Sequence, residues 1–276
     1  MIFAIVRFFT ILFFRQLGLI GYYLSRKRKK VVLSNLTLCF GALQKQNNKI
    51  AKESYISLGH AMADFILLKR YSAKNIDKYI AFKNLNYLQE ALSLGRGVII
   101  CSGHFGSWEL AAHALALKGY KSLILYNPIK KPAWLEKAVI KRREVGGNQL
   151  ISKRAALGKV GRWLRRGGVA TLLVDQNCKP VDGVRIPLLG QDVWTNISFA
   201  QLSLRLGAPI VPGFIFTKGL GGYELYIGKP LYPEEFKSLE DPAKSIATAF
   251  YGELEGAITK SSGEWMWQHR RFKNLS

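Results

Sequence analysis

The sequence predicts an α/β fold, with a mixed, mostly parallel sheet flanked by helices and an N-terminal membrane-associated helix. Three observations favour this class. From residue 97 onward, short apolar runs alternate with helix-like stretches, the order typical of a sheet with helices on its faces. Glycines within residues 219–222 separate two apolar runs, which predicts a hairpin and so an antiparallel pair. Residues 2–24 are largely apolar, which favours membrane association.

The composition excludes a disordered chain and indicates an anionic partner. With 276 residues, 49% of them hydrophobic and 12% aromatic, the chain can bury a sizeable core. Its 41 Lys and Arg residues against 18 Asp and Glu residues give a formal net charge of +23. This excess favours nucleic acid, anionic lipid, or an acidic protein or substrate as partner, and charge alone does not choose among them.

The chain opens on an apolar segment that polar residues interrupt at three positions: Arg7, Arg15 and Gln16. A clean spanning helix needs about 20 apolar residues, so this segment is marginal for spanning. It has no small-residue cleavage site of the kind that ends a signal peptide. Arg7 and Arg15 lie about 80° apart on a helix, which leaves one broad apolar face.

A basic block, residues 26–30, follows the apolar segment directly. Such a block favours the cytoplasmic side of a membrane and anionic headgroups. We therefore predict a membrane anchor helix with its basic block at residues 1–30, and one domain at 31–276 that faces the cytoplasm. The alternative is an apolar helix that packs on the domain itself.

The remaining elements are predicted in chain order. Two helices at 31–40 and 49–68 precede the alternating region. That region is expected to contain strand 97–101, helix 107–118, strand 122–126, helix 133–145, strand 149–151, helix 155–166, strand 169–174, helix 196–206, strands 209–216 and 223–228, and helix 242–260. Asp241 and Pro242 are a cap and a first-position proline for the last helix.

A histidine and a carboxylate, His104 and Glu109, follow the buried strand at 97–101. On one helix they would point about 140° apart. They meet only if His104 lies in the loop at the strand tip and Glu109 in the first helical turn, with Gly103 and Gly106 giving the loop its freedom. This arrangement predicts a general base with an orienting carboxylate, at the edge where α/β sheets bind ligands. The alternative is a capping Glu beside an unrelated loop His.

A second polar cluster, Asp175-Gln176-Asn177, ends the strand at 169–174. It is expected on the same sheet edge as His104. These residues could hold the histidine, bind an acceptor or position a thioester, and the alternative is a turn closed by Asp and Asn side chains.

The stretch from 130 to 166 carries twelve Lys and Arg residues against two Glu residues. Most of these are expected on solvated helix faces, but so one-sided an excess favours an anionic partner. Arg154 is the predicted binding residue, because a guanidinium grips phosphate with two donors.

Other patterns narrow the chemistry. Cys39, Cys101 and Cys178 show no metal-type spacing, and Cys101 is predicted to be a core residue rather than a nucleophile. Dinucleotide and Walker fingerprints, the Gly-x-Ser-x-Gly elbow of a serine esterase and metal-binding spacings do not occur, so we predict no cofactor and no metal. The tail at 264–272 suits a membrane interface or a core strand with a basic edge. His269 within it is a second candidate base.

Several segments together resemble the lipid A biosynthesis (lauroyl/myristoyl) acyltransferase branch of the lysophospholipid acyltransferase superfamily. They span nearly the whole chain: HFGSWEL at 104–110, VDQN at 174–177, GVRIPLLG at 183–190, Thr195, WMWQHRRFK at 265–273 and RKKVVLSNLTLCF at 28–40.

The resemblance implies a glycerolipid acyltransferase-like fold at the cytoplasmic face of a bacterial inner membrane. It implies transfer of a fatty acyl chain from acyl carrier protein or coenzyme A to a lipid hydroxyl, with a lipid A precursor as expected acceptor. The partners would be acyl carrier protein, a lipid with an anionic headgroup and an anionic membrane surface, and no nucleic acid. The implied catalytic residues are His104 and Glu109, and the implied substrate-binding residues are Gly106, Trp108, Arg154, Asp175 and, less firmly, Asn177.

One departure leaves the acceptor open. Lipid A enzymes of this branch often carry Asp-Gln-Asp where this chain has Asp175-Gln176-Asn177, so a lysophospholipid or another glycolipid remains an alternative. A basic, non-enzymatic nucleic-acid-binding protein is the remote rival, but it leaves the apolar N-terminus unexplained. In the expected mechanism His104 deprotonates the acceptor, and amides near Gly103 and Gly106 or the Asn177 side chain bind the oxyanion.

Overall fold

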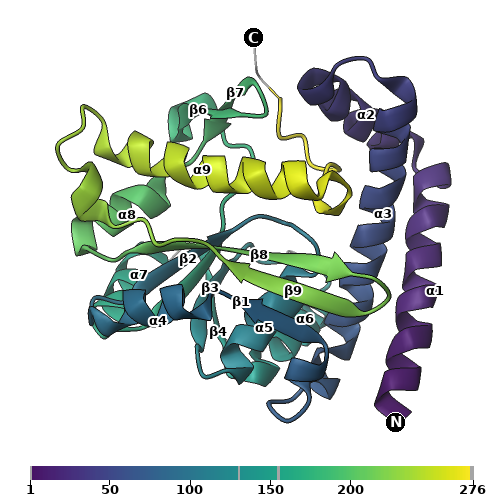
Figure 1. Cartoon of the computed structure of the whole chain (residues 1–276), viewed down its shortest axis with the longest axis horizontal. Helices are drawn as coiled ribbons and strands as arrows, with labels where there is room; N and C mark the ends of the chain where they lie inside the picture. Colours follow the sequence, from purple (N-terminus) through teal and green to yellow (C-terminus); the bar gives the residue numbers. More distant parts are fainter. Residues whose placement is uncertain (1, 130, 154–155, 274–276) are drawn as a thin grey trace.

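The structure is a computed structural model that describes residues 2–129, 131–153 and 156–273. Within these residues, seven strands form one sheet in the order β1-β9-β8-β2-β5-β3-β4. The strands β8, β2, β5, β3 and β4 run parallel to one another, whereas β9 is antiparallel to β8 and β1 pairs in parallel with β9 (Figure 1). The predicted fold class, a mixed and mostly parallel sheet flanked by helices, is therefore confirmed.

The bounds of the elements follow the predicted series closely. The strands are β1 Ile80–Lys83, β2 Val98–Ser102, β3 Ser122–Tyr126, β4 Gln149–Ser152, β5 Val169–Leu173, β6 Val184–Leu188, β7 Gln191–Thr195, β8 Ile210–Lys218 and β9 Gly222–Ile227. The helices are α1 Ile2–Leu24, α2 Arg26–Phe40, α3 Gln44–Leu67, α4 Leu85–Ser93, α5 Trp108–Leu117, α6 Ala133–Arg143, α7 Ala156–Arg165, α8 Ser198–Leu206 and α9 Pro242–Lys260.

Three segments were not predicted. Strand β1 has four residues and helix α4 nine, and Asn84 between them takes a left-handed conformation, so neither is long enough to show a clear period. Strands β6 and β7 form a separate antiparallel hairpin. Its turn is made by Leu189 and Gly190, both at positive φ. Leucine is an uncommon residue in that conformation, so the sequence carries no strong turn signal there.

Two apolar clusters cover the two faces of the sheet. One packs α7, α8, α9 and the C-terminal tail against β2, β5 and β8. The other packs α4, α5 and the end of α3 against β1, β2 and β9. The central strands β2 and β5 are buried at four of their five positions, as a parallel sheet covered on both faces requires. Their carboxyl ends therefore open at one edge, between the helical layers.

Helix α1 lies along α3 at one side of the molecule (Figure 1). It is the one described helix whose length and composition suit a membrane span, and little of it is buried. Two glycines set the spacing of the pair, since a Cβ on Gly18 would lie 2.2 Å from the Tyr55 carbonyl oxygen and one on Gly59 would lie 2.1 Å from that of Phe14. The helix is thus both apolar and closely docked on the body.

The docked helix keeps a broad apolar face exposed. Eleven of its large apolar side chains are exposed, among them Phe9 and Phe13. The basic block at 26–30 forms the first turns of α2, so the predicted boundary between residues 30 and 31 falls inside that helix. The proposed division into an anchor and a catalytic domain stays a prediction.

Candidate active site

The loop at residues 103–107, here called the His104 loop, joins the end of β2 to the start of α5. Its placement agrees with the prediction: His104 follows the strand tip, and Glu109 lies in the first turn of α5. Gly106 has a positive φ of 52°, and a Cβ there would lie 2.3 Å from the Ile215 carbonyl oxygen. The loop can therefore take this path only with glycine at position 106.

The carboxylate that holds His104 is that of Asp175. Nδ1 of His104 lies 2.7 Å from Asp175 Oδ1, and the His104 backbone N–H donates to Asp175 Oδ2 at 2.8 Å. The register explains this contact, because Ser102 of β2 pairs with Leu173 of β5 and two further residues along each chain are His104 and Asp175. Of the three roles that the sequence left open for the 175–177 cluster, Asp175 takes the first in this geometry, since it holds the histidine.

The orienting role expected of Glu109 is corrected by the same geometry. Both carboxylate oxygens of Glu109 accept from the Nε–H of Arg143, at 3.0 and 2.9 Å, and Arg143 Nη2 donates to it as well. Glu109 acts on His104 through its charge, without a hydrogen bond to the ring. The sequence could not show this, because Glu109 and Asp175 both lie at the same sheet edge.

The His104 and Asp175 side chains shift each other's ionisation. Burial lowers the pKa of His104, but the charge and hydrogen bond of Asp175, with the charge of Glu109, outweigh it, so the pKa is raised above its usual value. Burial raises the pKa of Asp175, but its contacts with His104 and Trp265 prevail and lower it to about 2. Asp175 is therefore ionised at neutral pH, and neutral His104 keeps its proton on Nδ1 and presents the Nε2 lone pair as base.

The C-terminal tail covers this pair. Trp265 Nε1 donates to Asp175 Oδ2 at 2.9 Å, the Met266 amide donates to the His104 carbonyl, and the Gly106 amide donates to the Glu264 carbonyl. The tail is not the strand that the sequence allowed, since it forms one isolated bridge, from Trp265 to Phe105. Its aromatic side chains are buried against the site.

His269 does not act as a base in the described geometry. Its Nε2 accepts the backbone N–H of Asn177 at 3.1 Å. Burial lowers the pKa of His269, and its neutral form suits this acceptor role. His269 therefore fixes the end of β5, next to Asp175.

Three of the loop amides near Gly103 and Gly106 already donate to acceptors within the protein. The N–H groups of His104, Phe105 and Gly106 donate to Asp175, to the Gly103 carbonyl and to the Glu264 carbonyl respectively. In this geometry the Gly106 amide is therefore not available to bind an oxyanion. The Asn177 side chain remains a candidate through its Nδ2 donors, whereas its buried Oδ1, an acceptor, has no hydrogen-bond partner among the described residues.

A pocket of about 710 Å³ lies beside the pair, at the carboxyl ends of β3 and β5. Its volume is within the range of ligand sites. His104 is not part of its wall, but Val174, Gln176 and Asn177, which flank Asp175, are. The apolar lining residues include Leu125, Ala156, Val160, Leu172, Phe199 and Leu202, and the charged lining residues are Lys153, Lys179, Lys273 and Asp182.

The other predicted residues are placed as follows. Trp108 packs edge-on against the His104 ring, with ring centroids 5.2 Å apart. Arg154 lies outside the described residues. The neighbouring Lys153, which the sequence offered only as one of twelve cations, lines the pocket, and its charge lowers the pKa of His104. Cys101 is fully buried, and burial raises the pKa of its thiol well above normal, as expected of a core residue.

The described residues hold no group of three or more His, Cys, Asp or Glu side chains placed to bind a metal ion.

The model of one protein family, the bacterial lipid A biosynthesis acyltransferases, matches residues 1–274. This chain belongs to that family.

Three relatives are identical to this chain at about a quarter of the aligned positions. The lipid A biosynthesis lauroyltransferase of Escherichia coli (strain K12) is 24% identical over 262 residues, which are 93% of this chain and 83% of the relative. The palmitoleoyltransferase of the same organism is 24% identical over 261 residues, 94% of this chain and 83% of the relative. A phosphatidylinositol mannoside acyltransferase of Mycobacterium tuberculosis is 24% identical over 162 residues, 57% of this chain and 50% of the relative.

Among solved structures, the 1-acyl-sn-glycerophosphate acyltransferase PlsC of Thermotoga maritima is similar, with a TM-score of 0.41 and 16% identity over 91% of this chain and 97% of that one. Family membership makes the chain an acyltransferase by relationship, and the His104–Asp175 pair is the part of the described structure suited to such a reaction.

Proposed function

We propose that the protein is a membrane-associated enzyme that moves a fatty acyl chain from an acyl thioester to a hydroxyl of a lipid, with His104 as general base. One observation carries the proposal: Nδ1 of His104 is held by Asp175 at 2.7 Å, beside an apolar pocket. Such a pair leaves Nε2 to act on a substrate, and the 16% exposure of the His104 side chain lets a substrate reach it.

The reaction then runs through two proton transfers. Nε2 of His104 takes the proton of the acceptor hydroxyl while the oxygen attacks the thioester carbonyl carbon. The imidazolium that forms is stabilised by the ionised Asp175. As the carbon–sulfur bond breaks, Nε2 returns the proton to the sulfur and a free thiol leaves. The Lys153 ammonium stabilises the charge that develops on the carbonyl oxygen.

The pocket beside β5 receives the acyl chain. Its apolar lining residues suit a hydrocarbon tail, and its three lysines, against one aspartate, suit an anionic headgroup or the acidic surface of a carrier protein. Phenylalanine in place of Ala156 would narrow this wall and shift the donor preference to shorter chains. Ala138→Phe, on the exposed surface of α6, is the control. Equal shifts of the chain-length preference in both variants would contradict the assignment of this pocket to the acyl chain.

Helix α1 and the basic block at 26–30 bind the membrane. An exposed apolar face of eleven large side chains exceeds what a soluble surface carries in one patch. The cations at 26–30 lie at the end of this face and favour anionic headgroups on the cytoplasmic side of an inner membrane. The body of the enzyme would then face the cytoplasm, where acyl carrier protein and coenzyme A are found.

A lipid A precursor is the proposed acceptor, because the relatives that match over more than nine-tenths of the chain are named for lipid A biosynthesis. The relative named for a phosphatidylinositol mannoside supports a second candidate, a different glycolipid, over the matching 57% of the chain. Departure from the Asp-Gln-Asp pattern at Asn177 keeps this second acceptor open.

Lipid mass spectrometry tests the proposal directly. Cells with the native gene, with its deletion and with His104→Ala are compared. Loss of one acyl group from one lipid class in both altered strains is the expected result, and the lipid class names the acceptor. Purified protein is then given acyl-acyl carrier protein or acyl-coenzyme A to identify the donor. Normal acylation by His104→Ala would contradict the mechanism.

A further inference from the structure

A buried cation links α1 to the body of the enzyme. Arg7 is 4% exposed although it belongs to an apolar helix. Its Nε–H donates to the Tyr71 hydroxyl at 2.6 Å, and its guanidinium lies 4.6 Å from the centroid of the Tyr79 ring. The β8–β9 turn makes room for it, since a Cβ on Gly221 would lie 2.1 Å from Arg7 Nη1. Burial of a guanidinium costs free energy of hydration unless hydrogen bonds and an opposite charge offset it.

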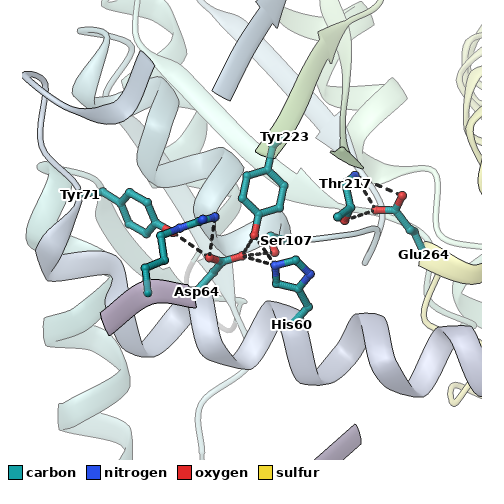
Figure 2. Close-up of polar contacts among 8 residues, drawn as sticks. His60, Asp64, Tyr71, Ser107, Thr217, Tyr223 and Glu264 are labelled. Atoms are coloured by element: carbon teal, nitrogen blue, oxygen red, sulfur yellow. Dashed lines mark hydrogen bonds and ion pairs between the residues drawn. The ribbon is translucent and has the colours of Figure 1, made fainter. Parts of the chain in front are cut away.

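The counter-charge is Asp64 of α3, which is fully buried. Its Oδ1 lies 3.9 Å from Arg7 Nη2 and accepts the Tyr71 hydroxyl at 2.8 Å. Its Oδ2 accepts the hydroxyl of Tyr223, which lies 2.8 Å from His60 Nε2 (Figure 2). Burial lowers the pKa of His60 to about 4, so this imidazole is neutral. The Arg7–Asp64 pair therefore carries the charges of the cluster.

The third hydrogen-bond donor to Asp64 comes from the His104 loop. Ser107, the last residue of the His104 loop, is 2% exposed and donates its hydroxyl to Asp64 Oδ2 at 2.5 Å (Figure 2). Serine at a helix N-cap ordinarily uses its side chain to accept a backbone N–H of the helix. Ser107 occupies the N-cap of α5 and makes no such bond. Its hydroxyl is committed to Asp64 instead, so the loop is tied to α3.

We propose that Asp64 is a positioning residue for the His104 loop, and that Arg7 completes its charge balance, so that the docking of α1 sets the geometry of the catalytic histidine. The loop is held from two sides: the tail and Asp175 fix His104 and Gly106, and Asp64 fixes Ser107. Helix α1 is in this view part of the active-site support as well as the membrane-facing element. The inference rests on the proposed role of His104.

Steady-state kinetics in detergent micelles test the coupling, because recruitment to a bilayer then plays no part. Lauroyl-acyl carrier protein serves as donor and a lipid A precursor as acceptor. Ser107→Ala is expected to lower kcat by about 10- to 100-fold, the scale of a displacement near 1 Å, with KM changed less than kcat. Ser107→Thr keeps the hydroxyl and is expected to restore most of kcat.

Arg7→Gln is expected to lower kcat in the same way, whereas Lys45→Gln, which changes an exposed cation at the start of α3, leaves it unchanged. The double variant Arg7→Gln/Ser107→Ala should lose little more than either single variant, because both act through Asp64. Losses that multiply, or a kcat of Ser107→Ala equal to that of the native enzyme, would overturn the proposal. If circular dichroism shows that Ser107→Ala is unfolded, the comparison of Arg7→Gln with Lys45→Gln decides. The His104→Ala variant judges the proposed function separately, since it keeps the Asp64 cluster intact.

Discussion

Nδ1 of His104 lies 2.7 Å from Oδ1 of Asp175, a residue 71 positions further along the chain. The two side chains meet because β2 and β5 are neighbours in the sheet and run parallel in a register that aligns their ends. The Asp175 carboxylate also accepts a hydrogen bond from Trp265 Nε1. A base at one strand tip, its orienting acid at the next and a tail that covers both make a site whose parts come from three distant segments.

Asp175 should matter more to the rate than its sequence position suggests. Asp175→Asn removes the charge that stabilises the imidazolium and permits the wrong tautomer, so we expect kcat to fall by about 10³- to 10⁴-fold. Glu109→Gln acts on His104 only through space and should cost less. Initial rates measure the loss in each variant, and circular dichroism checks that both variants are folded. A larger loss in Glu109→Gln would return the orienting role to Glu109.

The rate should depend on pH through His104. The base must be neutral, and its pKa is raised above about 6.5 by Asp175 and Glu109 against the effect of burial. Activity should therefore rise with pH through a midpoint above 6.5. In Asp175→Asn the raising influence of Asp175 is lost while burial and Lys153 still lower the pKa, so the midpoint of the residual activity should move to lower pH. A profile of kcat/KM against pH measures both midpoints, and an unmoved midpoint would assign the titration to another group.

Trp265 should support Asp175 rather than the substrate. Trp265→Phe removes the N–H donor and leaves part of a buried carboxylate unsatisfied, at a cost of about 1–3 kcal/mol in the free energy of unfolding. Urea unfolding measures this difference. The control is Trp134→Phe, which changes an exposed tryptophan of α6 and should leave the unfolding midpoint unchanged.

Gly106 should accept no side chain. Gly106→Ala combines a positive φ with a Cβ 2.3 Å from the Ile215 carbonyl oxygen, so we expect a loss of stability and of activity, since the loop carries His104. Gly252→Ala is the matched control, because a Cβ there in helix α9 meets nothing within 4 Å and should gain about 1 kcal/mol in helix propensity. Thermal melts of the two variants should move in opposite directions.

The close packing of α1 against α3 should exclude a side chain at Gly18 but tolerate one at Gly21. A Cβ on Gly18 would lie 2.2 Å from the Tyr55 carbonyl oxygen, whereas on Gly21 its nearest contact is 3.5 Å from the Tyr55 ring. Gly18→Ala should therefore separate the helices and lower the thermal midpoint, and Gly21→Ala should not. Equal melting of both variants in detergent would mean that α1 is not docked as described.

The sequence by itself determined the local elements. Apolar period and flanking glycines located β2, α5 and β5, because these signals act over a few residues of chain. They also placed His104 after a strand tip and the 175–177 cluster after another. The turn at Leu189 and Gly190 was not found, since leucine gives no signal for the left-handed conformation it takes there.

Only the tertiary structure decided which carboxylate faces the imidazole. Glu109 is five residues from His104 and Asp175 is 71, yet strand order and register align Asp175 with His104, while Arg143 from α6 takes Glu109. The same holds for Arg7, which interrupts an apolar segment in the sequence and pairs with Asp64 in the fold. Contacts of this kind depend on how distant elements pack, and no local pattern of residues encodes the packing partner.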